Sequence, residues 1–539
     1  MSGHVFVVRG DLTRLACDGW LLPSDERLSL VPSWLGGTGS PTAVQRELLK
    51  SFAPMLGGYL GNPAHVKMSE RFSPDGERVA EILDWPDALP RPWPTNTGSH
   101  RGTDPAWYMQ SVDEFLDRVG PEVLRRPPRN GRQKPLLALP AVGTGHGGAR
   151  ASTAEILRLL LARLSAWVRD REVDVALVTH DAGAFAAAQA ARPRGPWPEL
   201  APHEAMAERL AAYAVQGKLV LFLGAGVSMA AGLPSWGQLL DQLAIDLGLT
   251  HERASLERLD FLDRAQILER KAGGRAAIRQ RIAARLDQDS HALSHALLAA
   301  LPVDEIITQN YDRLFELAAE PIGPLAIIPG VHPEHAARWL LKLHGSLERP
   351  DEIVLTREDY LRYDDRRSAL GGIVQALLMT KHMLFVGFSL EDVNFHRIID
   401  DVRKALRPTE GPAARRFGTA LLVEPDELRR SLWEDDLELH AMRAPPADPD
   451  AAGDSDGNGF VAAARRLEIF LDQLLWKSTT SAAYLLDRNY EHALSDAEKD
   501  LRAALEKIAS DRDRYRASPA WPHVRALLEH LGASLPKDE

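Results

Sequence analysis

Residues 221–236 read LFLGAGVSMAAGLPSW, an apolar run that leads directly into a turn of small residues. A strand that ends in Gly-x-Gly, here Gly224, Ala225 and Gly226, lets the backbone approach a pyrophosphate because no Cβ stands in the way. The helix that follows points free N–H groups at negative charge, and Ser228 lies in its first turn. The stretch therefore predicts a nucleotide-phosphate loop, and a tight strand-to-helix turn without a ligand is the alternative.

The composition excludes several classes of protein. The chain has 539 residues and a net charge of −11, which argues against broad binding of nucleic acid. Its one cysteine, Cys17, forms neither an internal disulfide nor a cysteine zinc cage, and this fits a reducing cytoplasm. We find no signal peptide and no apolar run of about 18 residues, so we expect a cytoplasmic protein with no membrane segment.

Apolar strands alternate with helices in two stretches of the chain, which predicts two α/β domains. The first covers residues 1–190, and its Pro- and Trp-rich part, 72–131, is interpreted as an insertion. A Pro-rich linker over 191–204 leads to a second domain over 205–478, in which 251–300 form a helical insertion. Residues 479–539 are expected to be a helical tail, for which oligomerisation is one interpretation.

Three further motifs follow predicted strands of the second domain. TQNYD (308–312) places Asn310 and Asp312 two residues apart, on one side of an extended segment, although either residue is also a common helix cap. KLHGS (342–346) places His344 at the carboxyl end of a strand, where open α/β sheets bind ligands. VGFSLEDVN (386–394) is another strand-end turn, which suits a ribose or phosphate, and its serine is otherwise a helix cap.

The order of these four motifs resembles the sirtuin (SIR2) family, and more closely its SIR2-like branch in bacterial anti-phage proteins. The resemblance covers about residues 218–478 and implies a Rossmann-like domain whose substrate is NAD. It implies a dinucleotide loop, a nicotinamide pocket, a second ribose and phosphate turn, and a catalytic histidine, His344. The residues that match the three binding segments are Gly224, Ala225, Gly226 and Ser228; Gln309, Asn310 and Asp312; and Gly387 and Ser389.

The sequence differs from the protein-deacylating sirtuins at two places. The first loop continues as GLPSW where those enzymes resemble GIPDFR, and residues 346–385 contain none of their four zinc-binding cysteines. The branch with this pattern hydrolyses NAD to nicotinamide and ADP-ribose, so we expect an NAD-depleting defence effector without zinc. We expect it to form a homo-oligomer and to act with a partner protein of a defence system.

In this hypothesis Asn310 positions water or the ribose, Asp312 holds the carboxamide and His344 is the general base. Two other interpretations stay open. One is an NAD-dependent protein deacylase or ADP-ribosyltransferase, and the other is a nucleotide sensor without turnover.

The first domain resembles macro domains, which bind ADP-ribose-type ligands. The opening VVRGDLTRLACDGWLLPSD (7–25) matches their Gly-Asp-hydrophobic-Thr turn, and Asp11 lies where that family contacts adenine. WLGGTGSP (34–41) resembles their first glycine loop. ALPAVGTGHGG (138–148), with Gly143, Thr144 and Gly145, resembles the loop that wraps the diphosphate. The second strand ends in LPSD, with Asp25 at the ribose position, where the family has asparagines. We therefore expect a ligand-binding domain that controls the second domain, and an α/β scaffold without a ligand is the alternative.

Overall fold

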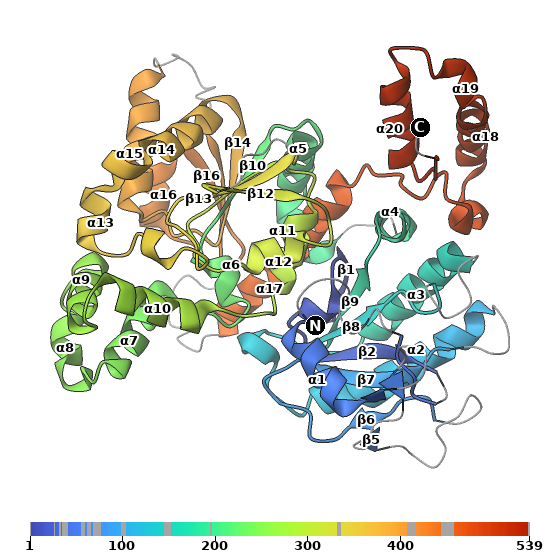
Figure 1. Ribbon diagram of the computed structural model, residues 1–539, viewed down its shortest axis with the longest axis horizontal. Helices are drawn as coiled ribbons and strands as arrows, with labels where there is room; N and C mark the ends of the chain where they lie inside the picture. The colour runs from blue at the N-terminus through green and yellow to red at the C-terminus, as the bar shows by residue number, and fades with distance from the viewer. Residues whose placement is uncertain are drawn as a thin grey trace. The chain divides into compact units, whose positions relative to one another are not determined.

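The computed structural model divides the chain into two compact units (Figure 1). It describes residues 2–25, 27–31, 34, 41–54, 60–61, 66–67, 77–98, 104–144, 152–193, 197–330, 336–406, 416–443 and 458–536. Unit 1 contains residues 1–129, 134–198 and 479–539, and unit 2 contains 130–133 and 199–478. The C-terminal residues therefore belong to the same unit as the N-terminal ones.

Unit 1 is built on a five-stranded sheet in which all neighbouring strands are parallel, in the order β1-β9-β8-β2-β7. Strands such as VFVVR and DVALVT are buried along almost their whole length, as expected when helices cover both faces of a parallel sheet. Its elements are β1 (Val5–Arg9), η1 (Leu12–Arg14), β2 (Gly19–Ser24), α1 (Ala43–Ser51), β3 (Ala53–Pro54), β4 (Leu60–Gly61), β5 (Val66–Lys67), β6 (Glu81–Ile82), β7 (Arg91–Asn96), α2 (Pro105–Val123), β8 (Leu136–Pro140), α3 (Thr153–Val168), β9 (Asp174–Thr179) and α4 (Ala182–Ala191).

The interpretation of residues 72–131 as an insertion is wrong. This stretch contains β7, one of the five sheet strands, and the long helix α2. Pro92 and Pro94 made RPWPTN unlike a strand, because proline cannot donate a ladder hydrogen bond. The structure accommodates both prolines because β7 is the last strand in the sheet order, where a proline nitrogen breaks no ladder of a central strand.

The C-terminal residues are helical, as expected. They form η9 (Arg488–Ala493), α18 (Asp496–Ser510), α19 (Arg512–Tyr515) and α20 (Trp521–His530). Leu486, Trp521 and Leu528 form their small buried core. A Cβ on Gly183 of α4 would lie 3.4 Å from the carbonyl oxygen of Ala483. The start of the C-terminal segment therefore packs against helix α4 of unit 1.

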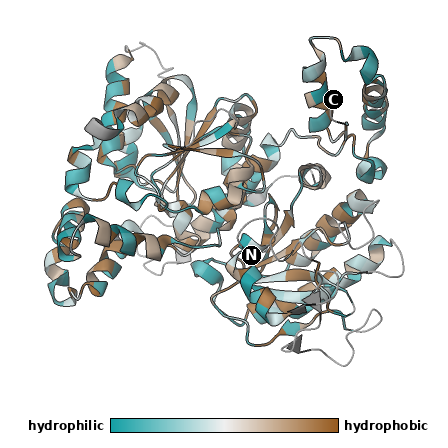
Figure 2. Ribbon diagram, in the orientation of Figure 1, coloured by the Kyte–Doolittle hydropathy of each residue, from teal (hydrophilic) through white to brown (hydrophobic). Residues whose placement is uncertain are grey.

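Unit 2 is built on a seven-stranded parallel sheet in the order β12-β13-β11-β10-β14-β15-β16. The first of these strands along the chain, β10, lies in the middle of the sheet. The next three strands, β11, β12 and β13, lie on one side of it, and the last three, β14, β15 and β16, lie on the other. The strand order therefore reverses at β10, and ligands of open α/β sheets bind at such a point, beyond the carboxyl ends of the strands. Figure 2 shows the hydrophobic residues concentrated along these strands.

The elements of unit 2 follow the predicted alternation, with somewhat shorter strands than expected. They are α5 (Glu204–Val215), β10 (Leu219–Leu223), α6 (Ala225–Met229), α7 (Trp236–Asp246), η6 (Thr250–Glu252), α8 (Arg253–Leu256), α9 (Phe261–Lys271), α10 (Arg275–Leu286), α11 (Leu293–Ala300), β11 (Glu305–Thr308), α12 (Leu314–Ala319), β12 (Leu325–Ile328), β13 (Arg338–Lys342), η8 (Pro350–Glu352), α13 (Arg357–Leu361), α14 (Tyr363–Thr380), β14 (His382–Val386), α15 (Val393–Ala405), β15 (Gly418–Leu422), α16 (Glu427–Trp433), β16 (Leu437–Ala441) and α17 (Asn458–Ser478). Two further 3₁₀ turns, η3 (Arg129–Gly131) and η5 (Pro198–His203), complete the described elements.

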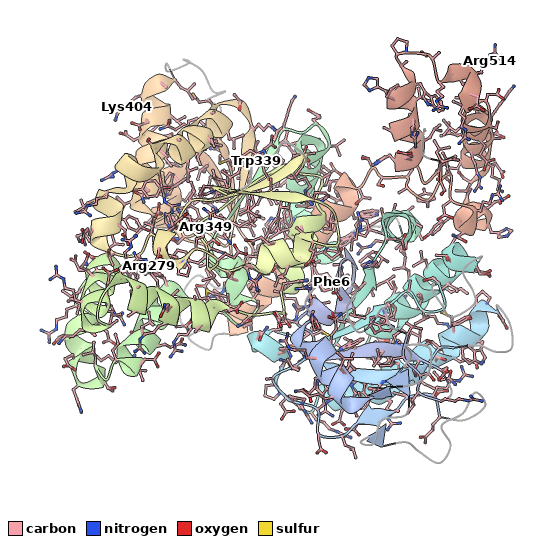
Figure 3. All side chains as sticks on the ribbon, viewed as in Figure 1. Phe6, Arg279, Trp339, Arg349, Lys404 and Arg514 are labelled. Atoms are coloured by element: carbon pink, nitrogen blue, oxygen red, sulfur yellow. The ribbon has the colours of Figure 1, made fainter. Side chains whose placement is uncertain are left out.

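The predicted helical insertion, residues 251–300, lies between β10 and β11 and contains α8 to α11. Helix α7, which precedes this insertion, begins with a capping box, in which Ser235 and Gln238 bond each other's backbone N–H groups. The buried guanidinium of Arg279 on α10 (Figure 3) donates to the carbonyl oxygen of Ile353 and to the Asp359 carboxylate. The insertion is thereby fixed to the segment that follows the KLHGS motif. Among the described residues, no helix is long and apolar enough to span a bilayer.

Candidate active site

Asn310, Ser228 and Asp312 form one hydrogen-bonded network at the carboxyl end of the second sheet. The Asn310 Nδ2 donates to Ser228 Oγ at 2.9 Å and to the carbonyl oxygen of Gly224 at 3.0 Å. Ser228 Oγ in turn donates to Asp312 Oδ2 at 2.8 Å. The network joins the TQNYD motif to the GAGVS motif, as the sequence predicts for a shared pocket. Asp312 also bonds to the first residue of α12, since its Oδ1 accepts from the Leu314 N–H at 3.0 Å.

The glycines of the first and fourth motifs bring two backbones into contact. The Gly226 N–H donates to the carbonyl oxygen of Gly387 at 2.9 Å, and a Cβ on Gly224 would lie 2.4 Å from the same oxygen. Gly387 has φ +64°, and a Cβ there would lie 2.5 Å from the Val227 nitrogen. These glycines are therefore required by the packing of one loop on the other, whether or not a phosphate also approaches them.

His344 meets an acidic residue from the fourth motif. Its Nε2 lies 3.6 Å from Asp392 Oδ2, and that same oxygen accepts a 2.9 Å hydrogen bond from the Tyr360 hydroxyl. The other Asp392 oxygen accepts from the Phe395 N–H and caps α15. The rings of Tyr360 and Tyr363 pack edge-on against the imidazole, which is only 5 % exposed.

Burial lowers the pKa of His344 below its ordinary value, while the Asp392 carboxylate raises it and the Arg367 guanidinium lowers it further. The physical cause is the loss of hydration of a charged imidazolium. The neutral form that can accept a proton is therefore favoured at neutral pH, which suits a general base.

Backbone hydrogen bonds connect the second and third motifs. The Leu343 N–H donates to the carbonyl oxygen of Thr308, and the Leu347 N–H donates to that of Tyr311. Together with the contacts described above, these bonds connect each of the four motifs to two others, in a ring at the carboxyl ends of β13, β11, β10 and β14. The structure thus brings Asn310, Asp312, Ser228 and His344 to one edge of one sheet.

The other sequence-predicted residues of unit 2 lie at the same edge with different surroundings. Ala225 and Gly226 are exposed, and so is Ser389, whose carbonyl oxygen accepts from the Arg429 guanidinium. Gln309 is half-buried, and its Nε2 has no hydrogen-bond partner among the described residues. The same holds for His344 Nε2 and for both side-chain amide atoms of the buried Asn394. Buried polar groups without partners are rare in native proteins, and a ligand or water is one explanation for them.

Sequence reasoning missed His295 on α11. Its side chain is 1 % exposed, and its Nδ1 has no hydrogen-bond partner among the described residues. Burial lowers the pKa of His295 to about 3, with a smaller contribution from His291. Its only signal in the sequence is a histidine inside LSHALLAA, a helix whose other residues are almost all apolar.

His295 lines a small cavity together with Asn310 and Asp312. The volume of about 10 Å³ leaves room for about one water molecule. Its walls are Leu223, Val227, His295, Thr308, Asn310, Asp312, Phe315 and Glu316. A pyridine ring does not fit this volume, so a nicotinamide could enter only after side chains move.

A second cavity, of about 240 Å³, adjoins the KLHGS turn. Arg349, labelled in Figure 3, lines it and pairs with Glu352 at 3.1 Å. Gly345 and Ser346 also line it, and Ser346 Oγ donates to the Glu348 carboxylate. Its walls combine the charged side chains of Lys342, Glu348, Arg349 and Glu352 with the apolar ones of Ile327 and Pro329.

The residues predicted for unit 1 serve local turns in the structure. Asp11 accepts hydrogen bonds from both the N–H and the hydroxyl of Thr13, and it caps η1. A Cβ on Gly143, where φ is +77°, would lie 2.7 Å from the Tyr108 ring, and Thr144 Oγ1 donates to the carbonyl oxygen of Ala141. Gly145 and the first glycine loop, 35–40, lie outside the described residues.

Two other side chains of unit 1 stand out at the carboxyl ends of adjacent strands. Ser24 on β2 and Asn96 on β7 are register partners, so their side chains share one face of the sheet. Both residues are buried, and Ser24 Oγ and the two amide atoms of Asn96 have no hydrogen-bond partner among the described residues. The sequence analysis missed Asn96 because it lies in the stretch interpreted as an insertion.

Comparison with known proteins assigns the second sheet. Residues 304–439, which include three of the four motifs, match the family described as SIR2-like domain. The chain carries a SIR2-like domain. The match begins after the GAGVS loop and ends within β16. Among the described residues we find no group of three or more His, Cys, Asp or Glu side chains that could hold a metal ion.

Several curated proteins are similar to part of this chain. NAD(+) hydrolase ThsA of Enterococcus faecium is 32 % identical over 208 residues, which cover 36 % of this chain and 42 % of that protein. NAD(+) hydrolase ThsA of Bacillus cereus (strain MSX-D12) is 32 % identical over 234 residues, 41 % of this chain and 46 % of that protein. Defense-associated sirtuin 2 of Bacillus subtilis is 28 % identical over 197 residues, 35 % and 19 % respectively. The chain thus spans less than half the length of each of these relatives.

Proposed function

We propose that the protein hydrolyses NAD to nicotinamide and ADP-ribose. The observation that carries the proposal is the Asn310–Ser228–Asp312 network, which lies at the switch point of the SIR2-like domain and lines a cavity there. The names of the ThsA relatives support the substrate and the reaction. NAD is a substrate in this proposal, and no resident metal takes part.

Hydrolysis of NAD needs no acid to protonate the leaving nicotinamide, but it does need a correctly positioned water molecule and ribose. A water oxygen bonds to C1′ of the ribose while the C1′–N bond to the pyridinium breaks, and the electron pair of that bond neutralises the departing ring. The water's proton needs an acceptor, and the ribosyl centre passes through an oxocarbenium-like state that negative partial charge stabilises.

The roles of the side chains follow from this chemistry. We assign Asn310 to the water or the ribose, Asp312 to the carboxamide, and His344 to the general base. The unpartnered atoms of Gln309, His344 and Asn394 are available for ligand hydrogen bonds. Gly224, Ala225, Gly226, Ser228, Gly387 and Ser389 would line the dinucleotide. The cavity beside Asn310 has room for about one water, so side chains there would have to move for a nicotinamide to occupy it.

We propose a defence role on the same basis. The relatives are named as NAD(+) hydrolases and as a defense-associated sirtuin, so depletion of NAD is the proposed output. Gating of this effector by a trigger is part of the proposal. Formation of a homo-oligomer, action in the cytoplasm and a partner protein belong to this proposal as well.

A protein deacylase is the alternative that NAD chemistry leaves open. Charged side chains, Glu348, Arg349 and Glu352 among them, line part of the larger cavity next to the KLHGS turn, where a deacylase needs an apolar channel for the acyl group. The absence of cysteine between residues 346 and 385 also removes the zinc module expected of that class. Incubation with NAD and an acylated peptide separates the two, because a deacylase forms O-acyl-ADP-ribose and a hydrolase forms free ADP-ribose.

We also propose that unit 1 is a macro-like domain that binds an ADP-ribose-type nucleotide and regulates NAD hydrolysis. The buried side chains of Ser24 and Asn96, which have no hydrogen-bond partner within the described part of the chain, support a polar ligand site beyond β2 and β7, next to the Gly143 turn after β8. Regulation requires that this ligand bind the two states of the enzyme with different affinity. Calorimetric titration of the full chain with ADP-ribose and its cyclic isomers tests the idea, and no binding of any of them contradicts it.

The hydrolase proposal is tested by the products. Purified full-length protein is incubated with NAD, with and without the nucleotides above, and nicotinamide and ADP-ribose are separated by chromatography. We expect both products in equal amounts.

A further inference from the structure

A buried lysine, Lys342, forms hydrogen bonds to the backbone of the TQNYD segment. Lys342 is the last residue of β13 and is 1 % exposed. Its Nζ donates to the carbonyl oxygen of Asp312 at 2.6 Å and contacts that of Tyr311 at 3.4 Å. The third partner is Glu316 Oε1 on α12, at 2.5 Å. An ammonium has three protons to donate, so these three acceptors satisfy it completely.

These bonds reach the backbone of the residues whose side chains form the candidate site. Asp312 is held on its side-chain end by Ser228 and on its backbone end by Lys342. Asn310 precedes this anchored pair of residues by one position and shares Ser228 with Asp312. A buried charge is tolerated only where its hydrogen bonds are all satisfied, and here they are satisfied by this loop.

We propose that Lys342 is a positioning residue for NAD cleavage, which fixes the direction of Asp312 and Asn310 through the two backbone carbonyls. This inference rests on the proposed hydrolase function, and it assigns a role that neither the motif resemblance nor the family match gives to this lysine. Lys342 touches no substrate in this account. Its effect on turnover passes through Asp312, which contacts the nicotinamide carboxamide, and through Asn310.

The experiment compares three variants of the full chain. Lys342→Met keeps the length of the side chain and removes all three hydrogen bonds. Lys342→Met combined with Glu316→Gln also removes the carboxylate that the first variant leaves without its partner, so it protects folding. Lys381→Met is the control, because Lys381 forms a part-buried ion pair with Glu305 at the amino end of the same sheet, away from the motifs.

Each variant is assayed for the KM of NAD, for inhibition by nicotinamide and for binding of ADP-ribose, which lacks the nicotinamide. ADP-ribose binding is measured as competitive inhibition of NAD turnover, so that it reports on the NAD site of unit 2 and not on unit 1. We expect the first two variants to raise the KM and the nicotinamide inhibition constant, each on the order of tenfold or more, as a misplaced contact group does. ADP-ribose binding should stay unchanged, and Lys381→Met should behave like the wild type. A general loss of structure would weaken ADP-ribose binding to the same extent.

Two results overturn the inference. One is wild-type nicotinamide inhibition in both Lys342 variants. The other is an equal loss of nicotinamide and ADP-ribose binding, which assigns Lys342 to general stability. If the wild-type protein itself releases no nicotinamide, the proposed function fails and this inference fails with it. Wild-type turnover with unaffected Lys342 variants contradicts the positioning role alone.

Discussion

His344 Nε2 lies 3.6 Å from Asp392 Oδ2, although the strands before these two residues are separated by two others in the sheet. The contact closes the ring of four motifs, because Asp392 belongs to the turn that also packs against Gly224 and Gly226. A carboxylate in this position stabilises the imidazolium that a general base becomes when it takes a proton. Burial opposes that effect and dominates it, so the pKa of His344 is lowered overall.

The activity should therefore persist into mildly acidic solution. A base works when it is unprotonated, and a pKa below the ordinary 6.5 keeps His344 neutral to a lower pH. We expect the acidic limb of kcat/KM for NAD to lie below pH 6.5, and to move further toward acid in Asp392→Asn, since the residue that raises the pKa is then neutral. The position of the acidic limb is measured from the rate of nicotinamide release as a function of pH.

Two outcomes of that pH series contradict the assignment of His344. An acidic limb at or above pH 6.5 shows that burial does not control the base. A limb that moves to higher pH in Asp392→Asn shows that the carboxylate acts in the opposite sense. Arg367, Tyr360 and Tyr363 also face the ring, and Tyr360→Phe is the control, because it removes the hydroxyl bonded to Asp392 and leaves the charge.

Ser228 should be essential because it connects the side chains of Asn310 and Asp312. Ser228→Ala removes the donor of Asp312 and an acceptor of Asn310, and each group then has space to turn. We expect kcat/KM for NAD to fall on the order of a hundredfold, as for a small displacement of a reacting group. The matched control is Ser431→Ala on the exposed surface of α16, which should keep full activity. Equal activity of both variants would remove the network from the mechanism.

The sequence predicted which residues meet in this network, but it predicted only part of the contacts that hold them there. Parallel strands bring their carboxyl ends to one edge, so motifs placed after strands had to meet, and Asn310, Asp312 and His344 do. Contacts between motifs far apart in the chain were beyond sequence reasoning, as for Asp392 with His344 or Lys342 with Asp312. Such pairs depend on the order of the strands in the sheet and on the direction of the side chains, and a local sequence motif predicts neither.

Gly387→Ala should disrupt the contact between the two glycine loops. A side chain there meets both an unfavourable φ of +64° and the Val227 nitrogen at 2.5 Å. Gly217 has the same φ of +64° with open space around it, so Gly217→Ala measures the backbone strain alone. We expect Gly217→Ala to lower the free energy of unfolding by about 1–2 kcal/mol. Gly387→Ala should lower it by about a further 1–3 kcal/mol, because overpacking is added.

Thermal or denaturant unfolding of the two variants provides the measurement, and NAD turnover provides a second one. Only Gly387→Ala should also lose activity. Equal destabilisation by the two substitutions contradicts the close approach of the loops.

His295 should make the protein sensitive to acid. The folded state holds it neutral down to a pKa of about 3, whereas in the unfolded chain it takes up a proton below about pH 6.5. The free energy of unfolding should therefore decrease between pH 6.5 and 3, by up to about 1.4 kcal/mol per pH unit for this one group. His295→Gln should have a shallower decrease over the same range. Identical slopes for the two proteins would contradict the buried, neutral state of this histidine.

The structure also changes how two parts of the sequence are understood. Proline made RPWPTN unlike a strand, yet it is an edge strand, and Asn96 at its end is a buried polar residue of unit 1. His295 went unnoticed because a single histidine in an apolar helix is most often a core residue, and only the cavity beside Asn310 distinguishes it. In both cases the missing information was burial without a hydrogen-bond partner.

The most direct test of the account is NAD turnover by the wild-type protein, Asn310→Ala and His344→Ala, assayed side by side with and without ADP-ribose-type nucleotides. Nicotinamide and ADP-ribose are quantified by chromatography. The account predicts equimolar release of both products by the wild type, and a rate lower on the order of a hundredfold or more in each variant. Undiminished turnover in both variants, or a wild type that releases no nicotinamide under any of these conditions, would contradict it.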